Sequence, residues 1–158
     1  MIVRKLSTNE AAEAPAFTHI AIVTADDLTQ TAANTAQTIN LCALKKYDII
    51  LRALGVPYVP FQNTGDAAFN SDTVSVGDTG SATRFTTATE ANANGSFGRA
   101  LGNTPNLYTA ADTLLIVVNA MAAKNLNSIN RGEYHIFFAL NRSDDISVAI
   151  ARARYTKP

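Results

Sequence analysis

Few side chains in this sequence have the chemistry and spacing of a catalytic site. The chain has one cysteine, Cys42, and two histidines, His19 and His135, the residue types that serve as nucleophile and general base. Cys42 lies in an alternating run with Ile39 and Leu41, which is typical of a buried thiol that acts as a small hydrophobe. Both histidines lie in predicted strands, and no G-x-S-x-G, H-E-x-x-H or glycine-rich phosphate loop accompanies them. The sequence therefore predicts no catalytic residues.

Acidic residues gather in predicted turns, where their oxygens could hold Ca²⁺. These residues are Asp26, Asp27, Asp66, Asp72, Asp78, Asp144 and Asp145. No segment matches the D-x-[DN]-x-[DN]-G loop, and Asp and Asn favour turns because they hydrogen-bond to nearby backbone. A single cysteine also excludes a disulfide framework within the chain and a multi-cysteine metal cluster. We therefore predict no metal site and no cofactor.

Two further groups of residues could bind a partner rather than catalyse a reaction. The segment from Arg152 to Lys157 is mildly basic and could contact nucleic acid or an acidic partner, although a solvated strand face has the same composition. Aromatic residues predicted near loops could stack on carbohydrate: Tyr58, Phe61, Phe97 and Tyr108. The chain has no tryptophan, which weakens the carbohydrate interpretation but leaves it as an alternative.

Composition limits the possible partners. The chain has 158 residues, with 13 Lys+Arg against 13 Asp+Glu and a formal net charge of zero. Hydrophobic residues make up 47%, which is too many for a wholly disordered chain. Without a block of Lys or Arg the chain lacks the charge needed to wrap nucleic acid. A net charge of zero removes the self-repulsion that keeps a protein monomeric, so we expect the chain to function in an assembly.

The hydrophobic runs are short. The longest are Leu114 to Val118 and Ile136 to Leu140, well below the roughly 20 residues that span a bilayer as a helix. The first residues lack the apolar stretch of about 7–15 residues that a signal peptide contains. We therefore expect no membrane partner.

The elements that must position these side chains are short strands. Apolar, β-branched or alternating runs occupy residues 17–24, 38–42, 48–56, 73–76, 82–89, 96–101, 112–118 and 133–140. Pro57 and Pro60 are expected to close the third of these strands, because proline cannot donate to a ladder. Asn94-Gly95 predicts a hairpin, since a type I′ turn needs positive φ at both central positions. No segment keeps a helical period over three turns, so the pattern predicts an all-β, antiparallel β-sandwich of the jelly-roll kind.

The chain divides into three predicted parts. Residues 1–15 are polar and alanine-rich without a clear period, which indicates an extended N-terminal arm that is disordered alone or ordered only against a partner. Residues 16–145 form the β-sandwich domain. Residues 146–158 alternate apolar and basic side chains, as a C-terminal strand or tail would.

Between Asp48 and Leu140 the order of the segments resembles that of a known class of proteins. The segments are Ile49-Ile50-Leu51, Val74-Ser75-Val76-Gly77-Asp78, Arg84-Phe85-Thr86, Leu107-Tyr108-Thr109-Ala110-Ala111-Asp112-Thr113, and Glu133-Tyr134-His135-Ile136-Phe137-Phe138-Ala139-Leu140. In these segments the chain is similar to small β-sandwich head decoration (cement) and minor capsid proteins of tailed bacteriophages. The resemblance implies a non-enzymatic virion protein bound to the capsid lattice, often as a trimer, and implies no catalytic residues. It does not extend to the arm before residue 30 or the tail after Leu140.

We therefore expect a structural protein of the capsid surface that stabilises the lattice. Its expected partners are the major capsid protein and further copies of itself, as a homotrimer, without nucleic acid, membrane or cofactor. A receptor- or carbohydrate-binding module of a virion appendage is the alternative. An enzyme would require His19, His135 and an acidic residue to converge on one pocket.

Overall fold

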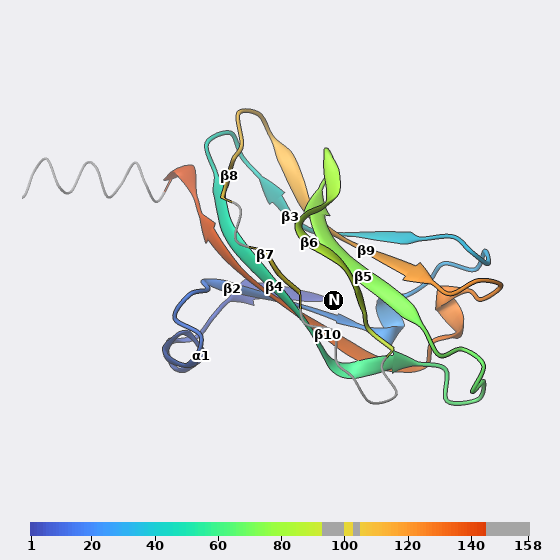
Figure 1. Cartoon of the computed structure of the whole chain (residues 1–158). Helices are drawn as coiled ribbons and strands as arrows, with labels where there is room; N and C mark the ends of the chain where they lie inside the picture. The colour runs from blue at the N-terminus through green and yellow to red at the C-terminus, as the bar shows by residue number, and fades with distance from the viewer. Residues whose placement is uncertain (93–99, 103–104, 145–158) are drawn as a thin grey trace, which may run out of the picture.

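The chain forms two antiparallel β-sheets packed face to face in a computed structural model, which describes residues 1–92, 100–102 and 105–144 (Figure 1). The strands are β1 (Ile2–Lys5), β2 (His19–Thr24), β3 (Gln37–Leu44), β4 (Ile49–Gln62), β5 (Asp72–Asp78), β6 (Ser81–Glu90), β7 (Ala100–Gly102), β8 (Asn106–Leu107), β9 (Asp112–Ala120) and β10 (Arg131–Asn141). The helical elements that lie wholly within the described residues are α1 (Thr8–Glu13) and two 3-10 turns, Ala25–Asp27 and Leu126–Ser128; Ser143 and Asp144 also have helical backbone. No helix in this part of the chain is long and apolar enough to cross a membrane. The predicted all-β antiparallel sandwich is confirmed.

The order of the strands is that of a long antiparallel hairpin rolled up on itself. Strand β2 pairs with β10, β3 with β9, β4 with β7 and β8, and β5 with β6. Rolling this hairpin adds the pairs β10–β4 and β9–β5 and produces a larger sheet in the order β1-β2-β10-β4-β7 and a smaller one in the order β3-β9-β5-β6. This is the jelly-roll arrangement, in which β2 to β5 alternate between the two sheets and the chain turns back at the β5–β6 hairpin within the smaller sheet.

The two most apolar predicted strands lie in the middle of the two sheets. Strand β9 lies between β3 and β5, and β10 lies between β2 and β4. In β10 the alternate side chains Tyr134, Ile136 and Phe138 are fully buried between the sheets. Because β9 and β10 each have partners on both sides, their backbone polar groups are satisfied while their apolar faces are buried.

The prediction that Pro57 and Pro60 end a strand is wrong. Strand β4 continues through both prolines to Gln62. Its pairing with β7 and β8 ends at Gly55, so among the described residues the second half of β4 has β10 as its one strand partner, with one further hydrogen bond from the Phe61 amide to the carbonyl of Ala91. The β4–β10 register also shifts on either side of Glu133, next to these prolines. Proline has no N–H to donate, and it is tolerated here for two reasons. The prolines lie beyond the part of β4 that pairs with β7 and β8, and the irregular β4–β10 register beside them requires fewer donors than a regular ladder.

Two predicted features lie wholly or partly outside the described residues. The Asn94-Gly95 turn is one of them, so the hairpin stays a prediction. Of the strand expected after this turn, residues 100–102 form β7, which hydrogen-bonds to β4 of the larger sheet. The predicted C-terminal strand or tail, residues 146–158, also lies outside the described part. The proposed three-part division of the chain therefore remains a prediction.

One carboxyl group is buried without an ionic partner. Asp72 begins β5, its exposed fraction is 1%, and neither side-chain oxygen has a hydrogen-bond partner within the described residues. The hydroxyl of Tyr134, from the opposite sheet, is likewise buried without a partner in this part of the chain. Burial, followed by the charge of Glu90, raises the pKa of Asp72 from its ordinary 3.8 to about 8. The folded chain therefore holds this carboxyl in its neutral form at pH 7.

This burial predicts a stability that falls as pH rises from about 4 to about 8. In that window the unfolded chain releases the Asp72 proton and the folded chain retains it. The free energy of unfolding therefore falls by up to about 1.4 kcal/mol per pH unit. Asp72→Asn removes the ionisable group, so the free energy of unfolding of the variant should depend less on pH over this range. Relative to the wild type, the variant should become more stable as the pH rises from 5 to 8. Urea unfolding at pH 4.5, 6 and 8 measures the difference.

The exposed Asp26 provides the control. Asp26→Asn should follow the wild-type pH profile throughout. Parallel profiles for the wild type and Asp72→Asn would show that Asp72 ionises normally in the folded chain.

Candidate assembly interface

The N-terminal residues form an extra edge strand and a short helix on the larger sheet. Strand β1 pairs with β2 antiparallel, with Ile2 opposite Ile22 and Lys5 opposite His19. After β1, the amide of Leu6 donates to the carbonyl of Thr18 at 2.9 Å, which brings the start of the arm beside the start of β2. The sequence prediction of an arm without a clear period missed both elements, because a four-residue strand and a six-residue helix are too short to show one.

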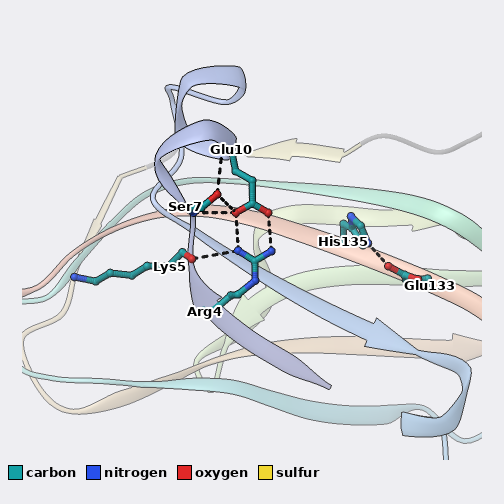
Figure 2. Close-up of polar contacts among 6 residues, drawn as sticks. All are labelled: Arg4, Lys5, Ser7, Glu10, Glu133 and His135. Carbon is teal, nitrogen blue, oxygen red and sulfur yellow. Dashed lines mark hydrogen bonds and ion pairs between the residues drawn. The ribbon is translucent and has the colours of Figure 1, made fainter.

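Local hydrogen bonds explain why α1 forms at all. Ser7 caps the helix, with its hydroxyl accepting from the amide of Glu10 while the Glu10 carboxylate accepts from the amide of Ser7 (Figure 2). Arg4 donates to both carboxylate oxygens of Glu10, at 2.6 and 2.7 Å. The Arg4 guanidinium, together with the hydrogen bonds from Ser7, holds the pKa of Glu10 well below its usual range. No residue of α1 is buried, so the helix depends on these exposed contacts rather than on packing.

The arm covers part of the outer face of the larger sheet, the face turned away from the smaller sheet. The ring of Phe17 lies 5.9 Å from that of Phe137 on β10. A groove of about 280 Å³ separates the segment Glu13–Phe17 from Leu54 and Phe137. The arm thus leaves an apolar groove between itself and the sheet.

Beyond the arm, the same face of the sheet is only partly covered: Tyr58 is exposed and its neighbours are half-buried. Tyr58 of β4 is 66% exposed and its ring stacks on that of His135 in β10, with centroids 4.7 Å apart and planes 8° apart. His135 is also paired with Glu133 through Nε2 (Figure 2). By strand register, His135 has Ile22 on one side and Val56 on the other. We call Ile22, Val56, Tyr58, His135 and Phe137 the outer patch.

The outer patch reaches the edge of the sheet at β1. Ile2 is opposite Ile22 in the β1–β2 ladder and is 58% exposed. A run of exposed and half-buried apolar and aromatic side chains across several strands is the kind of surface that binds other proteins.

Motifs that are far apart in the sequence converge at one polar cluster elsewhere in the fold. Asp78 ends β5 and is fully buried; its Oδ2 accepts from the hydroxyl of Tyr108 at 2.9 Å and pairs with Nε of Arg84. Its Oδ1 accepts from the amides of Gly80 at 3.1 Å and Ser81 at 2.9 Å. Both oxygens of this carboxylate are therefore occupied, which makes the cluster a structural one.

This cluster joins the β5–β6 turn to the loop before β9. Thr79 donates through its hydroxyl to Asp112 Oδ1 at 2.5 Å, and the Thr113 amide donates to the same oxygen at 2.7 Å. Burial, and the hydrogen bond to Asp78, raise the pKa of Tyr108 above its usual range, so its hydroxyl stays a donor. Three of the segments that carry the sequence resemblance thus meet here because they stabilise one another.

The residues considered for catalysis do not come together. His19 stacks on the core side chain Phe138, whereas His135 lies on the opposite, outer face of the same sheet. Cys42 is half-buried against the core, and burial raises the pKa of its thiol, which favours the unreactive protonated form. The convergence required by the enzyme hypothesis therefore does not occur.

The acidic residues and aromatic residues considered for binding are also dispersed. Within the described residues, no group of three or more His, Cys, Asp or Glu side chains is arranged to hold a metal ion. Of the aromatic candidates, Phe61 and Tyr108 are buried, Tyr58 is exposed, and Phe97 lies outside the described residues. The basic segment Arg152 to Lys157 also lies outside them. Sequence reasoning missed the outer patch, because alternation alone does not tell which face of a strand is covered.

Removing Arg84 should destabilise the fold by leaving Asp78 buried with its charge uncompensated. Loss of one partner of a fully buried pair costs about 3–5 kcal/mol, and because Arg84 is itself 35% exposed we expect Arg84→Ala to cost about 2 kcal/mol. Tyr108→Phe should cost about 1 kcal/mol, the value of one hydrogen bond. Urea unfolding at pH 7 measures both. Arg52→Ala, at an exposed arginine on β4, is the control, and an equal loss there would contradict a special role for the cluster.

Comparison with known proteins yields only structural similarity. No family model matches the chain, and no curated protein matches it by sequence. A chain from the capsid asymmetric unit of cyanophage Pam1 is similar over 78% of this chain and 81% of its own length, with a TM-score of 0.53 and 19% identity. A chain of the acid-stable capsid of Helicobacter pylori bacteriophage KHP30 has a TM-score of 0.45 and 13% identity, over 88% and 91% of the two chains. The C-terminal domain of the sugar-binding protein EclA has a TM-score of 0.38 and 12% identity over 77% and 76%.

Of these three structures, only the first has a TM-score above 0.5. At 19% identity this similarity shows that the two chains share a fold. The capsid chain of cyanophage Pam1 therefore has the same β-sandwich architecture as this chain.

Proposed function

We propose that this chain is a non-enzymatic structural protein of a virion, which binds the capsid lattice and stabilises it at the capsid surface. The observation that carries the proposal is the outer patch, in which the exposed Tyr58 lies among half-buried apolar and aromatic side chains, beside an arm whose helix has no buried residue. The fold shared with a capsid chain supports the same conclusion at the level of architecture.

The chemistry of the outer patch fits a protein partner. Tyrosine supplies a large contact area at a low cost in side-chain entropy, and Tyr58 is already held flat by His135. The charge of the chain sums to zero, so close packing of many copies meets little overall repulsion. The proposed partners are the major capsid protein and other copies of this chain, as a homotrimer.

The arm is the part of this surface that can rearrange when a partner binds. The arm is held by the β1–β2 ladder, the Leu6–Thr18 hydrogen bond, two ion pairs and the half-buried Val3. Just beyond it, the ring of Phe17 is tilted at 50° to that of Phe137. Exposed ion pairs contribute little to stability, so the arm belongs to the least stable part of the fold. We propose that residues 1–15 rearrange against a neighbouring subunit when the lattice forms.

A receptor- or carbohydrate-binding role is the second candidate. One observation favours it: the free face of the Tyr58 ring, held flat by His135 and close to the Glu133 carboxylate, could stack on a sugar ring. Binding to a glycan array that Tyr58→Ala abolishes, without binding to capsids, would favour this function over the first.

A charge placed in the outer patch should abolish capsid binding without unfolding the chain. Native particles that contain the protein are stripped of it and then incubated with purified variants. We expect the wild type to bind saturably, and Tyr58→Glu to bind at least about tenfold more weakly, as loss of a central aromatic contact predicts. Sedimentation of the particles with labelled protein measures this.

Tyr47→Glu is the matched control, because Tyr47 is 55% exposed but lies in the β3–β4 turn, away from the outer patch. It should bind as the wild type does, and a chain lacking residues 1–15 should bind more weakly. Equal binding of Tyr58→Glu and the wild type would reject the outer patch as the interface, and absence of the chain from purified particles would reject the function.

A further inference from the structure

The N-terminal arm is attached to the sandwich through its first six residues. Strand β1 pairs with β2 along its whole length, and the amide of Leu6 adds a hydrogen bond to the carbonyl of Thr18. Val3 packs against the core between the sheets, and the ammonium group of Met1 pairs with Asp27. These contacts all come from residues 1–6, which lie along the edge of β2.

The helix that follows is held by contacts inside the arm. No residue of α1 is buried, and the helix projects from the side of the sandwich (Figure 1). The Glu10 carboxylate accepts from the amide of Ser7 and from the guanidinium of Arg4, and all three residues belong to the arm (Figure 2). The polar contacts that shape α1 therefore move with the arm.

The segment of residues 7–17 leaves the sandwich and returns to the same place. The residues on either side of it, Leu6 and Thr18, are joined by their hydrogen bond at 2.9 Å. Pro15 lies in this segment directly after Ala14, the C-cap of α1, where proline stops a helix and favours extended backbone in the residue before it. Fully extended, residues 7–17 span about 36 Å, roughly the diameter of a small domain. That length is sufficient to reach β2 of an adjacent copy.

The outer edge of β2 needs a strand beside it. Ala21 and Val23 of β2 are fully buried, and β10 already occupies the other side of the strand. An arm that only detached would leave this apolar edge open, and open apolar edges pair with other chains. The strand that fits the edge is another β1, because it supplies the same register and the same core contact of Val3.

We propose that β1 is exchanged between copies of this chain when they assemble. In the exchanged state, β1 of one copy pairs with β2 of the next in the same register, and residues 7–17 connect the two copies. This inference rests on the proposed self-association of the chain and names the contact that produces it. The occupant of the β2 edge is thus a second copy rather than an unrelated protein.

Exchange replaces each contact of residues 1–6 by the same contact on a neighbour. What is lost is freedom of movement, and an assembly offsets that loss by holding the neighbouring edge at a high effective concentration. A contact that runs from each copy to the next is heterologous and closes into a ring when the rotation allows it. A ring of three copies is the proposed homotrimer.

Disulfide trapping across β1 and β2 tests the exchange. In a Cys42→Ser background, one protein carries Ile2→Cys and a second carries Ile22→Cys, two positions that lie opposite each other in the ladder. Opposite residues of antiparallel strands have Cα atoms about 4.5–5.5 Å apart, within the range that a disulfide spans. The two proteins are mixed at high concentration and oxidised. We expect crosslinks that join position 2 of one protein to position 22 of the other.

Thr87→Cys in place of Ile22→Cys is the matched control, because Thr87 is exposed on β6 in the smaller sheet. Its mixture with the Ile2→Cys protein should crosslink at least about tenfold less. Products are separated on a non-reducing gel and located by mass spectrometry. Equal crosslinking in the two mixtures, or no crosslink between positions 2 and 22, would overturn the proposal.

A chain that carries both Ile2→Cys and Ile22→Cys gives a second measurement. Oxidised when dilute, it should form the disulfide within one chain and hold β1 on its own β2, and a reductant should reverse this. At high concentration we expect the oxidised chain to associate at least about tenfold more weakly than the reduced chain, because the exchanged contact is lost. Sedimentation velocity measures the association. Equal association of the two forms would contradict the exchange.

These measurements use no capsid, so the two proposals fail separately. Exchange by a chain that binds no particle would leave this inference standing and reject the proposed function. Particle binding by a chain whose crosslinks all stay within one chain would reject the exchange and retain the function.

Discussion

Burial of one face of β10 determines which side chains lie on the outer face of the larger sheet. Its alternate residues Tyr134, Ile136 and Phe138 fill the space between the sheets, which forces His135 and Phe137 onto the opposite face. A shift of one residue would exchange the two sets, so the register that buries the core also builds the outer patch. Directly after the same strand, Arg142 donates to the Ala43 carbonyl of β3 and to the buried carboxylate of Asp48.

Three buried aspartates differ in whether neighbouring groups compensate the charge of the carboxylate. Asp78 and Asp48 are buried with an arginine and backbone amides around them, so their charges are compensated. Asp72 is buried to a similar extent but lacks such partners among the described residues, and the raised pKa follows from that difference. Asp78 and Asp48 connect loops to strands through their hydrogen bonds, whereas Asp72 makes the stability of the fold depend on pH.

The surface of the sandwich divides into regions of different stability. The centre of each sheet is fixed by pairing on both sides, and the N-terminal arm is held by a short ladder and exposed polar contacts. Proteins commonly draw their binding elements from such marginal regions, because partners can then stabilise an alternative arrangement. The proposed lattice contact uses this marginal arm together with a rigid surface, the outer patch.

Local patterning was sufficient to predict the strands and the fold class. Apolar runs such as 112–118 and 133–140 must be buried, and turn-forming Asn, Asp and Gly between short strands indicate an antiparallel sandwich. Tertiary structure decided the rest, because pairing partners and the covered face depend on contacts distant in sequence. Pro57 is compatible with β4 because that half of the strand has no second strand partner among the described residues. The two histidines lie on opposite faces only because of the β2–β10 register, and the exposure of Tyr58 depends on where the arm ends.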